Sequence, residues 1–175
     1  MKIKTETATF AGGCFWGIEK LFSEIDGVID TKVGYTGGKI KNPSYERVCT
    51  GLTGHAESIE ITFDPSKLSY KELLETFFSY HDPTTVNRQG NDVGTQYRSA
   101  IFYHDESQER TAKKAVELLI QAKVFKDKIV TSIEPASEFY AAEDYHQKYL
   151  KKNPNGYCHI HFQSHKIHDV LQKLT

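Results

Sequence analysis

The chain has 175 residues, the length of one domain that buries a hydrophobic core of its own. Its 22 Lys and Arg residues are balanced by 23 Asp and Glu residues, and no basic stripe is interleaved with aromatic residues, so nucleic-acid binding has no electrostatic support. We find no apolar run behind the charged first residues and no stretch of membrane-spanning length, and we therefore expect one domain over residues 1–175 in the cytoplasm, with no role for a membrane.

The first expected elements are a strand over Thr5–Ala11 and a helix over Phe15–Ile25. The helix carries apolar residues at helical spacing, and Gly12 and Gly13 allow the chain to turn tightly before it. Cys14 stands where the helix begins, beside amide groups that have no partner within the helix and at the positive end of the helix dipole. Both features stabilise a thiolate, so we predict that Cys14 is a reactive nucleophile.

Two aromatic residues, Phe15 and Trp16, follow this cysteine, and Trp16 is the single Trp of the chain. A cysteine beside glycine is most often a small buried hydrophobe. Phe and Trp in the first helical turn next to two glycines are poor choices for packing alone, which favours a catalytic role. An aromatic wall beside a thiol indicates a substrate with a small apolar group.

The remaining elements alternate between strands and helices. Strands are expected at Val28–Tyr35, Ala56–Phe63, Ser99–Tyr103 and Val130–Ile133. Helices are expected after Ser69 through Tyr80, with a capping box to Glu72, over Ser107–Ala122, as one turn at Tyr45–Cys49, and near Asp144–Lys151 and Ile167–Leu174. The polar stretch Asp82–Tyr97 is expected to be a long loop. This alternation predicts an α/β two-layer sandwich with a mixed sheet and leaves the strand order undetermined.

The chain contains three cysteines, Cys14, Cys49 and Cys158, and no Cys-x-x-Cys pair. An odd number at such wide separations argues against a secreted disulfide scaffold. It favours a reducing compartment in which a thiol takes part in catalysis.

The run Gly-Cys-Phe-Trp-Gly at Gly13–Gly17 is the signature of the A-type peptide-methionine sulfoxide reductases, and the chain resembles that family from Ala11 to about His159. The other matching segments, in the family's order, are Val33–Gly38, Asn42–Tyr45, Gly54–Glu57, Asp82–Thr84, Gly90–Asp92, Gln96–Ser99, Ala142–Gln147 and Asn153–Cys158. The resemblance implies a ferredoxin-like plait with a long coiled C-terminal tail. It also implies a monomer without cofactor or metal that reduces the S epimer of methionine sulfoxide, free or in oxidised proteins.

Reducing a sulfoxide requires a soft nucleophile, an acid that protonates the leaving oxygen, and a pocket for the methyl group. Cys14 supplies the nucleophile, and Phe15 and Trp16 match the family's methyl-binding wall. Glu57 in Gly-His-Ala-Glu is the expected acid, because burial at the start of an apolar strand would raise the pKa of its carboxyl. A Glu at the end of a strand is more often exposed to solvent, so the assignment of Glu57 as the acid depends on the matching Gly-His-Ala-Glu motif.

Three residues match the family's substrate site. Tyr45 and Tyr97 match tyrosines that hydrogen-bond the sulfoxide oxygen, and Asp92 matches an aspartate that shapes the site. Without the matching motifs, each Tyr would be expected to be an amphipathic residue of the core, and Asp92 would be expected to form an Asx turn. Tyr35 is a further tyrosine in a matching segment, but its motif first indicates the end of a strand, so we rank it below Tyr45.

The expected reaction leaves a sulfenic acid on Cys14, with which a second thiol must condense. Cys158, preceded by Gly and Pro, is the candidate resolving cysteine, and thioredoxin is the expected reductant. The strand-like run His159–Phe162 departs from the Gly-rich tail of some relatives, so recycling by an external thiol stays open. Cys49, beside Val48, is expected to be a buried structural thiol.

Two other activities stay open. A zinc site is conceivable in a tail cluster whose spacing fits no standard finger, namely Cys158, His159, His161, His165 and His168. A cysteine hydrolase could use Cys14 with His55 or His146 as its base, which would leave the aromatic pair and Glu57 unexplained. A nonenzymatic binding module would explain none of these features.

Overall fold

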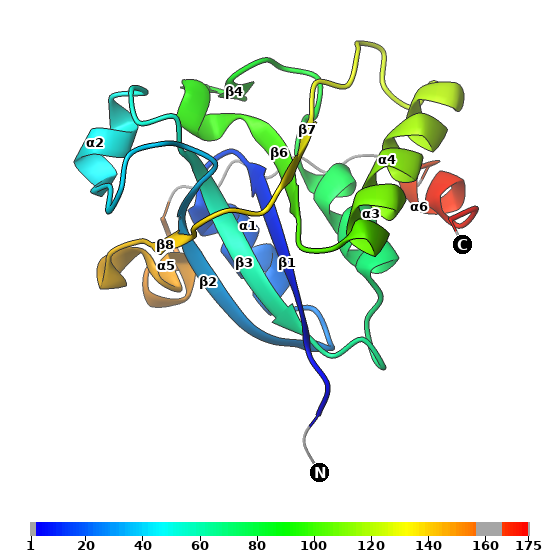
Figure 1. The fold of residues 1–175 in the computed structure, drawn as a ribbon, viewed down its shortest axis with the longest axis horizontal. Coiled ribbons are helices and arrows are strands. Elements are labelled where there is room, and N and C mark those ends of the chain that lie inside the picture. Colours follow the sequence, from blue (N-terminus) through cyan, green and yellow to red (C-terminus); the bar gives the residue numbers. More distant parts are fainter. Residues whose placement is uncertain (1–2, 157–165, 175) are drawn as a thin grey trace.

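The computed structural model describes residues 3–156 and 166–174, and within them one six-stranded sheet carries helices on one face (Figure 1). The sheet has the order β7-β6-β1-β3-β2-β8, with strands β1 (Glu6–Gly12), β2 (Val28–Thr36), β3 (Ala56–Phe63), β6 (Ser99–Tyr103), β7 (Ser132–Pro135) and β8 (Tyr140–Ala141). A separate ribbon pairs β4 (Arg88–Gln89) with β5 (Asp92–Val93). The helices are α1 (Phe15–Ser23), α2 (Tyr45–Cys49), α3 (Tyr70–Tyr80), α4 (Glu106–Gln121), α5 (Tyr149–Lys152) and α6 (Lys166–Leu171), with 3₁₀ turns η1 (Thr95–Tyr97) and η2 (Asp144–His146).

Four central strands form a ferredoxin-like plait. Helix α1 connects β1 to β2, β3 lies antiparallel between these two strands, and α3 leads from β3 to β6 on the far side of β1. After α4, β7 pairs parallel with β6, which makes the sheet mixed. The expected α/β two-layer sandwich is therefore confirmed. The part of the expected coiled tail at residues 157–165 lies outside the described residues.

The main core lies between the sheet and its helices. Alternate residues of a strand point to one face, so Phe10 of β1 and Ile59 and Ile61 of β3 meet α1 and α3. The Phe10 ring lies 5.7 Å from that of Phe22 and 4.9 Å from that of Phe77. Glu57 shares the face of Ile59, so the strand alternation directs its carboxyl toward the start of α1.

On the opposite face, the connection from β7 to β8 crosses the sheet (Figure 1). Ala11, Ala56 and Ala100 lie under this connection and pack with Ala136. At the β2 edge, a Cβ on Gly34 would lie 2.3 Å from the Tyr140 carbonyl oxygen, so this strand pairing requires glycine there. Small side chains therefore let the last third of the chain approach the sheet closely.

Local signals predicted several boundaries correctly. The Ser69 hydroxyl accepts from the Glu72 amide and the Glu72 carboxylate accepts from the Ser69 amide, each at 3.2 Å, so the capping box is confirmed.

The predicted strand Val130–Ile133 is displaced, since the Val130 amide donates to the Pro83 carbonyl at 2.7 Å and pairing begins at Ser132. The predicted loop Asp82–Tyr97 is wrong in detail, because it contains β4, β5 and η1.

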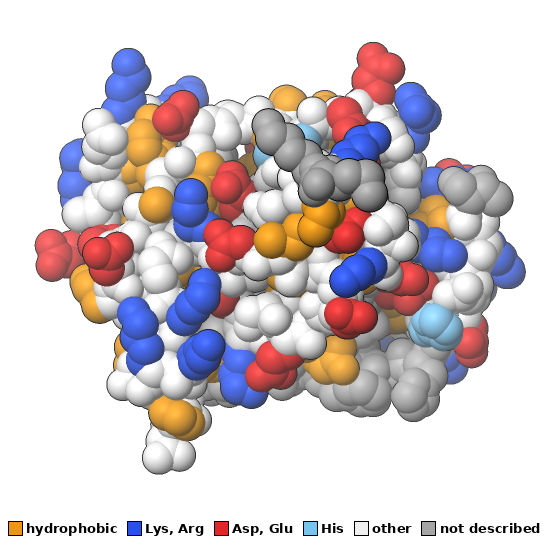
Figure 2. Space-filling model, turned by 90° about the horizontal axis from the view of Figure 1, so that it is seen from below, with side chains coloured by type: hydrophobic (Ala, Val, Ile, Leu, Met, Phe, Trp, Pro, Cys, Tyr) orange, Lys and Arg blue, Asp and Glu red, His pale blue; other side chains and the backbone are white. Residues whose placement is uncertain are grey.

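Figure 2 shows acidic and basic side chains interspersed over one face of the molecule. This mixture agrees with the balanced composition and with the absence of a basic stripe in the sequence. Among the described residues, no helix is both long and apolar enough to cross a membrane.

Candidate active site

Cys14 lies in the turn between β1 and α1. Gly13 has a φ of 98°, a conformation that favours glycine, and Cys14 directly precedes the first helical residue, Phe15. Cys14 itself is 8% exposed. A Cβ on Gly12 would lie 3.0 Å from the His81 ring, so the strand end is packed tightly against the α3 side of the core. The predicted position of the thiol at a helix N-terminus is confirmed.

Glu57 is 1% exposed, and its Oε1 accepts a hydrogen bond of 3.4 Å from the Phe15 amide. Burial raises the pKa of its carboxyl to about 8, against the lowering effect of the Phe15 amide and with a smaller contribution from Asp92. Its Oε2 is buried and has no hydrogen-bond partner among the described residues. A carboxyl that is protonated at neutral pH therefore lies against the residue that follows Cys14.

The two aromatic residues after Cys14 form a wall. Phe15 is buried in a cluster with Val33, Tyr35, Val48 and Ala142, against which Trp16 and Tyr45 pack. The Trp16 indole stacks on Tyr149 of α5, with ring centroids 3.8 Å apart and planes inclined by 12°. The wall therefore combines side chains from α1, β2 and the C-terminal third of the chain.

Tyr45 begins α2 and Tyr97 ends η1, and both side chains are half-buried. Burial raises the pKa of each phenol. Glu57 adds to this effect at both tyrosines, and Asp92 and Cys14 add to it at Tyr97. The structure therefore brings the predicted residues within electrostatic reach of one another, with both phenols protonated and able to donate.

Sequence reasoning assigned no role to Glu143, which the structure places behind this site. Its carboxylate accepts hydrogen bonds from the Tyr35 hydroxyl at 2.9 Å and the Tyr45 amide at 3.0 Å. Glu143 lies in one of the matching segments, Ala142–Gln147, and that placement was the available signal. Tyr35, completely buried, uses its hydroxyl in this network.

The prediction for Cys49 is wrong. Cys49 is exposed, because it ends the surface helix α2, from which Val48 points inward. Its thiol is hydrogen-bonded with the Tyr45 side chain. Cys49 therefore places a second thiol beside the candidate site.

Both histidines that a cysteine hydrolase could use as a base have their acceptor nitrogen occupied. His55 Nδ1 accepts from the Gly38 amide at 3.0 Å, and its Nε2 lies 2.6 Å from the Ile40 carbonyl oxygen, to which it donates. His146 Nδ1 accepts from the Trp16 indole at 3.0 Å. A nitrogen that already accepts a hydrogen bond cannot take the proton of a thiol, which argues against the hydrolase.

The cysteine and histidine cluster of the tail is described only in part. His168 pairs with Glu75 of α3 at 2.9 Å. The described ranges contain no group of three or more His, Cys, Asp or Glu side chains able to hold a metal ion. The predicted resolving cysteine Cys158 and the histidines 159, 161 and 165 lie outside them.

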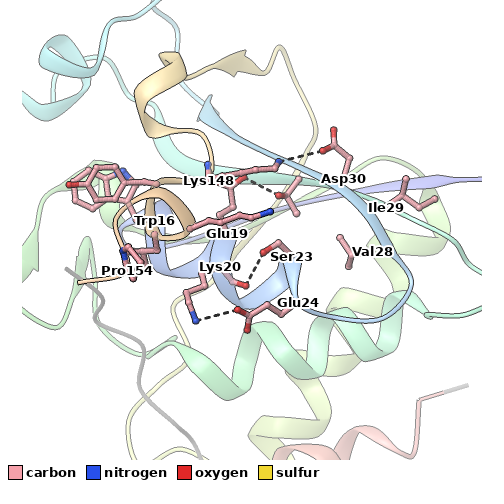
Figure 3. A pocket seen from close by; sticks show the side chains of 14 residues that line it. Trp16, Glu19, Lys20, Ser23, Glu24, Val28, Ile29, Asp30, Lys148 and Pro154 are labelled. Carbon is pink, nitrogen blue, oxygen red and sulfur yellow. Dashed lines mark hydrogen bonds and ion pairs between the residues drawn. The ribbon is translucent and has the colours of Figure 1, made fainter. Parts of the chain in front are cut away.

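A cavity of about 490 Å³ has Trp16 among its lining residues (Figure 3). It is lined by α1, the start of β2 and α5, and ion pairs join Lys20 to Glu24 at 3.2 Å and Lys148 to Asp30 at 3.7 Å. Cys14 and Glu57 do not line this cavity. Of the predicted site residues that the structure describes, Trp16 alone lines this cavity.

Comparisons with known proteins cover nearly the whole chain. The family model described as peptide methionine sulfoxide reductase matches residues 6–174. The peptide methionine sulfoxide reductase MsrA of Methanothermobacter thermautotrophicus is 58% identical over 155 residues, which cover 89% of this chain and 92% of that protein. Mxr1 of Saccharomyces cerevisiae in reduced form has a TM-score of 0.84 at 41% identity, covering 92% of this chain and 93% of that one. Mxr1 in complex with Trx2 has a TM-score of 0.60 at 26% identity, covering 94% and 96%.

Proposed function

The chain belongs to the peptide methionine sulfoxide reductase family, and we propose that it reduces the S epimer of methionine sulfoxide through a sulfenic acid on Cys14. Free methionine sulfoxide and oxidised proteins are the substrates, so the protein repairs oxidative damage. The observation that carries the proposal is the buried Glu57 carboxyl, with a pKa of about 8, against the helix start that holds Cys14.

The sulfur of Cys14 attacks the sulfoxide sulfur while Glu57 protonates the sulfoxide oxygen. A bond forms between the two sulfurs. The S–O bond of the substrate then breaks as the hydroxyl passes to the Cys14 sulfur, the bond between the sulfurs breaks, and methionine leaves Cys14–SOH behind. Two electrons pass from the cysteine sulfur to the substrate sulfur, and the thiol proton restores the Glu57 carboxyl. Oxide is a very poor leaving group, so a carboxyl held neutral by burial supplies what this step requires.

Selectivity for one epimer follows from two opposed sets of contacts. Phe15 and Trp16 hold the methyl group, and the Tyr45 and Tyr97 hydroxyls donate hydrogen bonds to the oxygen, with Asp92 shaping the loop beside them. A sulfur held at its methyl group and its oxygen presents one face to Cys14. The opposite epimer would place its oxygen against the aromatic wall.

For recycling, the Cys158 thiol attacks Cys14–SOH, a disulfide forms and water leaves. Thioredoxin then reduces the disulfide, and the complex of the yeast relative Mxr1 with Trx2 supports such a partner. An external thiol acting directly on Cys14–SOH is the alternative. The odd cysteine count favours the reducing cytoplasm as the compartment, and we expect the protein to act as a monomer.

Separated epimers of methionine sulfoxide test this function. With dithiothreitol as reductant, we expect the S epimer to disappear and the R epimer to persist, followed by chiral chromatography. Cys14→Ser should abolish the reaction while circular dichroism shows the same fold. Equal consumption of both epimers would contradict the pocket assignment. Turnover by the variant, or cleavage of a thioester by the wild type, would contradict the reductase mechanism.

A further inference from the structure

Two consecutive residues of η1, Thr95 and Gln96, bind the C-terminal end of α2 and the turn after it. The Thr95 hydroxyl donates to the Gly51 carbonyl oxygen at 3.1 Å, and the Gln96 side-chain amide donates to the Cys49 carbonyl oxygen at 3.4 Å. The two contacts, which we call the η1 tether, span 44 and 47 positions of the sequence. The last carbonyl groups of a helix have no partner within it, and a helix of five residues is not stable alone. The η1 tether therefore supplies partners that α2 itself lacks.

The Gln96 side chain fits its surroundings at a cost. The residue is 5% exposed, and its Oε1 is buried and has no hydrogen-bond partner among the described residues. A Cβ on Gly94 would lie 2.3 Å from this oxygen, and the Gly94 φ of 148° is one that favours glycine. A buried acceptor without a partner is unfavourable, so an apolar side chain of the same length would be more stable here. What the amide supplies in return is its N–H donor to α2.

The η1 tether joins the two elements that carry the tyrosines assigned to the sulfoxide oxygen. Tyr45 begins α2, and its hydroxyl is hydrogen-bonded with the side chain of Cys49, the residue whose carbonyl Gln96 binds. Tyr97 directly follows Gln96 and lies within electrostatic reach of both Cys49 and Tyr45. Both phenols therefore lie close to the point at which the tether fixes α2.

The sheet holds η1 more firmly than it holds α2. Directly after η1 comes β6, in which Ser99 pairs with Gly12 of β1. In contrast, α2 lies in the connection between β2 and β3 and projects away from the sheet (Figure 1). Release of the η1 tether would therefore shift α2, and Tyr45 with it, while Tyr97 keeps its place.

We infer that Thr95 and Gln96 are positioning residues that hold the C-terminal end of α2 and thereby set the distance between the Tyr45 and Tyr97 hydroxyls. The tether itself is independent of the proposed function, whereas its effect on turnover rests on that function. With the distance fixed, both hydroxyls donate to one sulfoxide oxygen. With α2 released, Tyr45 no longer meets that oxygen together with Tyr97.

Hydrogen exchange followed by nuclear magnetic resonance tests the tether without any turnover. Gln96→Met keeps the length of the side chain without the donor, and Thr95→Val keeps its shape without the hydroxyl. In each variant, and most in the double variant, we expect the amides in the last turn of α2 to exchange about 2–10-fold faster, the effect of losing one net hydrogen bond. Thr95→Ser keeps a hydroxyl and should exchange like the wild type. Gln108→Met is the matched control, because Gln108 is buried and donates to the Thr7 carbonyl at 2.8 Å, which joins α4 to β1 instead.

The effect on the reaction is measured as single-turnover formation of methionine from the S epimer of methionine sulfoxide at saturating substrate. We expect Gln96→Met to slow this step about 10-fold, less than the roughly 10²–10³-fold that deleting an oxyanion donor costs, with little change in substrate Kd. In a Tyr45→Phe background the same change should have no further effect, because the hydroxyl that the tether positions is gone. Gln108→Met should leave the rate unchanged in both backgrounds.

Unchanged exchange at the end of α2 in the Thr95→Val and Gln96→Met double variant would overturn the tether, and the single variants decide the question if the double variant does not fold. Faster exchange with an unchanged rate of methionine formation would overturn the positioning role. An equal loss of rate with and without Tyr45→Phe would overturn it as well. A wild type without turnover, in a protein whose variants show the faster exchange, would instead contradict the proposed function.

Discussion

At the scale of single residues, the burial of Glu57 has two consequences. Burial keeps its carboxyl protonated with a pKa of about 8, as an acid for the sulfoxide oxygen requires. The same burial makes the ionised form unfavourable in the folded protein. One environment therefore sets both the chemistry and the pH dependence of stability.

We expect Glu57→Gln to slow the single-turnover formation of methionine by about 10²–10⁴-fold, because an amide cannot deliver the proton. Substrate binding should change much less. In the wild type, the rate should fall as the pH rises through about 8, where Glu57 loses its proton. Rapid-quench measurements from pH 6 to 10 check both statements. A variant rate equal to that of the wild type would move the acid role to another group, such as a tyrosine.

The same variant tests the effect on stability. The folded protein holds the Glu57 proton to about pH 8, whereas the unfolded chain releases it near the ordinary value of 4.5. Stability from this group is therefore complete below about pH 4.5 and is lost as the pH rises to about 8, by up to about 5 kcal/mol. Melting temperatures of the wild type should fall more steeply between pH 6 and 9 than those of Glu57→Gln. Parallel curves would contradict a neutral buried carboxyl.

Residue positions could be predicted where they depend on local sequence. Cys14 at a helix start and Glu57 on the inner face of a strand follow from glycine placement and alternation. The hydrogen bond of His146 with Trp16 could not be found this way, because it spans 130 positions. Cys49 was predicted wrongly, since a five-residue helix gives no pattern that distinguishes its inner from its outer face.

At the scale of elements, α2 is too short to be stable alone. The Ser44 hydroxyl caps it by accepting from the Arg47 amide at 3.3 Å, and Glu143 accepts the Tyr45 amide at 3.0 Å. A carboxylate at a helix N-terminus is favoured by the helix dipole. The position of the Tyr45 hydroxyl therefore depends on Glu143.

We expect Glu143→Ala to destabilise the fold by about 1.5–3 kcal/mol, the range for hydrogen bonds to a charged group. It should also lower kcat more than it raises KM, because Tyr45 would no longer be aligned with the substrate oxygen. Urea unfolding and steady-state kinetics measure these effects. Glu138→Ala, which removes an exposed carboxylate from the connection between β7 and β8, is the matched control. Equal behaviour of the two variants would show that Glu143 does not position α2.

Elements with several alternating or capped residues, such as β3 and α3, were predicted at their observed bounds. The two-residue strand β8 was missed, because so short a strand has no alternation to detect. Its position depends on contacts at the β2 edge, where Gly34 admits the Tyr140 carbonyl.

At the scale of the whole molecule, the alternation of strands and helices predicted the fold class. The order β6-β1-β3-β2 could not be predicted, because it depends on pairings between distant strands. The proposed recycling belongs to this scale as well, since it would join Cys14 to Cys158 across the sequence.

If Cys158 resolves the sulfenic acid, one turnover without reductant should consume two thiols and leave a Cys14–Cys158 disulfide. Peptide mapping after excess substrate identifies the link. Cys158→Ser should keep single-turnover methionine formation and lose thioredoxin-dependent cycling. A Cys14–Cys49 link would assign the role to Cys49, whose thiol lies beside Tyr45. A persistent sulfenic acid would assign recycling to an external thiol.

The connection that crosses the sheet also orders events during synthesis. A ribosome makes the nucleophile, the acid and the four plait strands first, and N-terminal segments generally begin to fold first. Glu143, His146 and Tyr149, which contact Tyr45 and Trp16, emerge later than all of these. A nascent chain that stops before them carries the thiol and the acid in a plait whose aromatic wall is not yet aligned. If this wall selects the methyl group, the selectivity is acquired only after these residues have been made, later than the thiol itself.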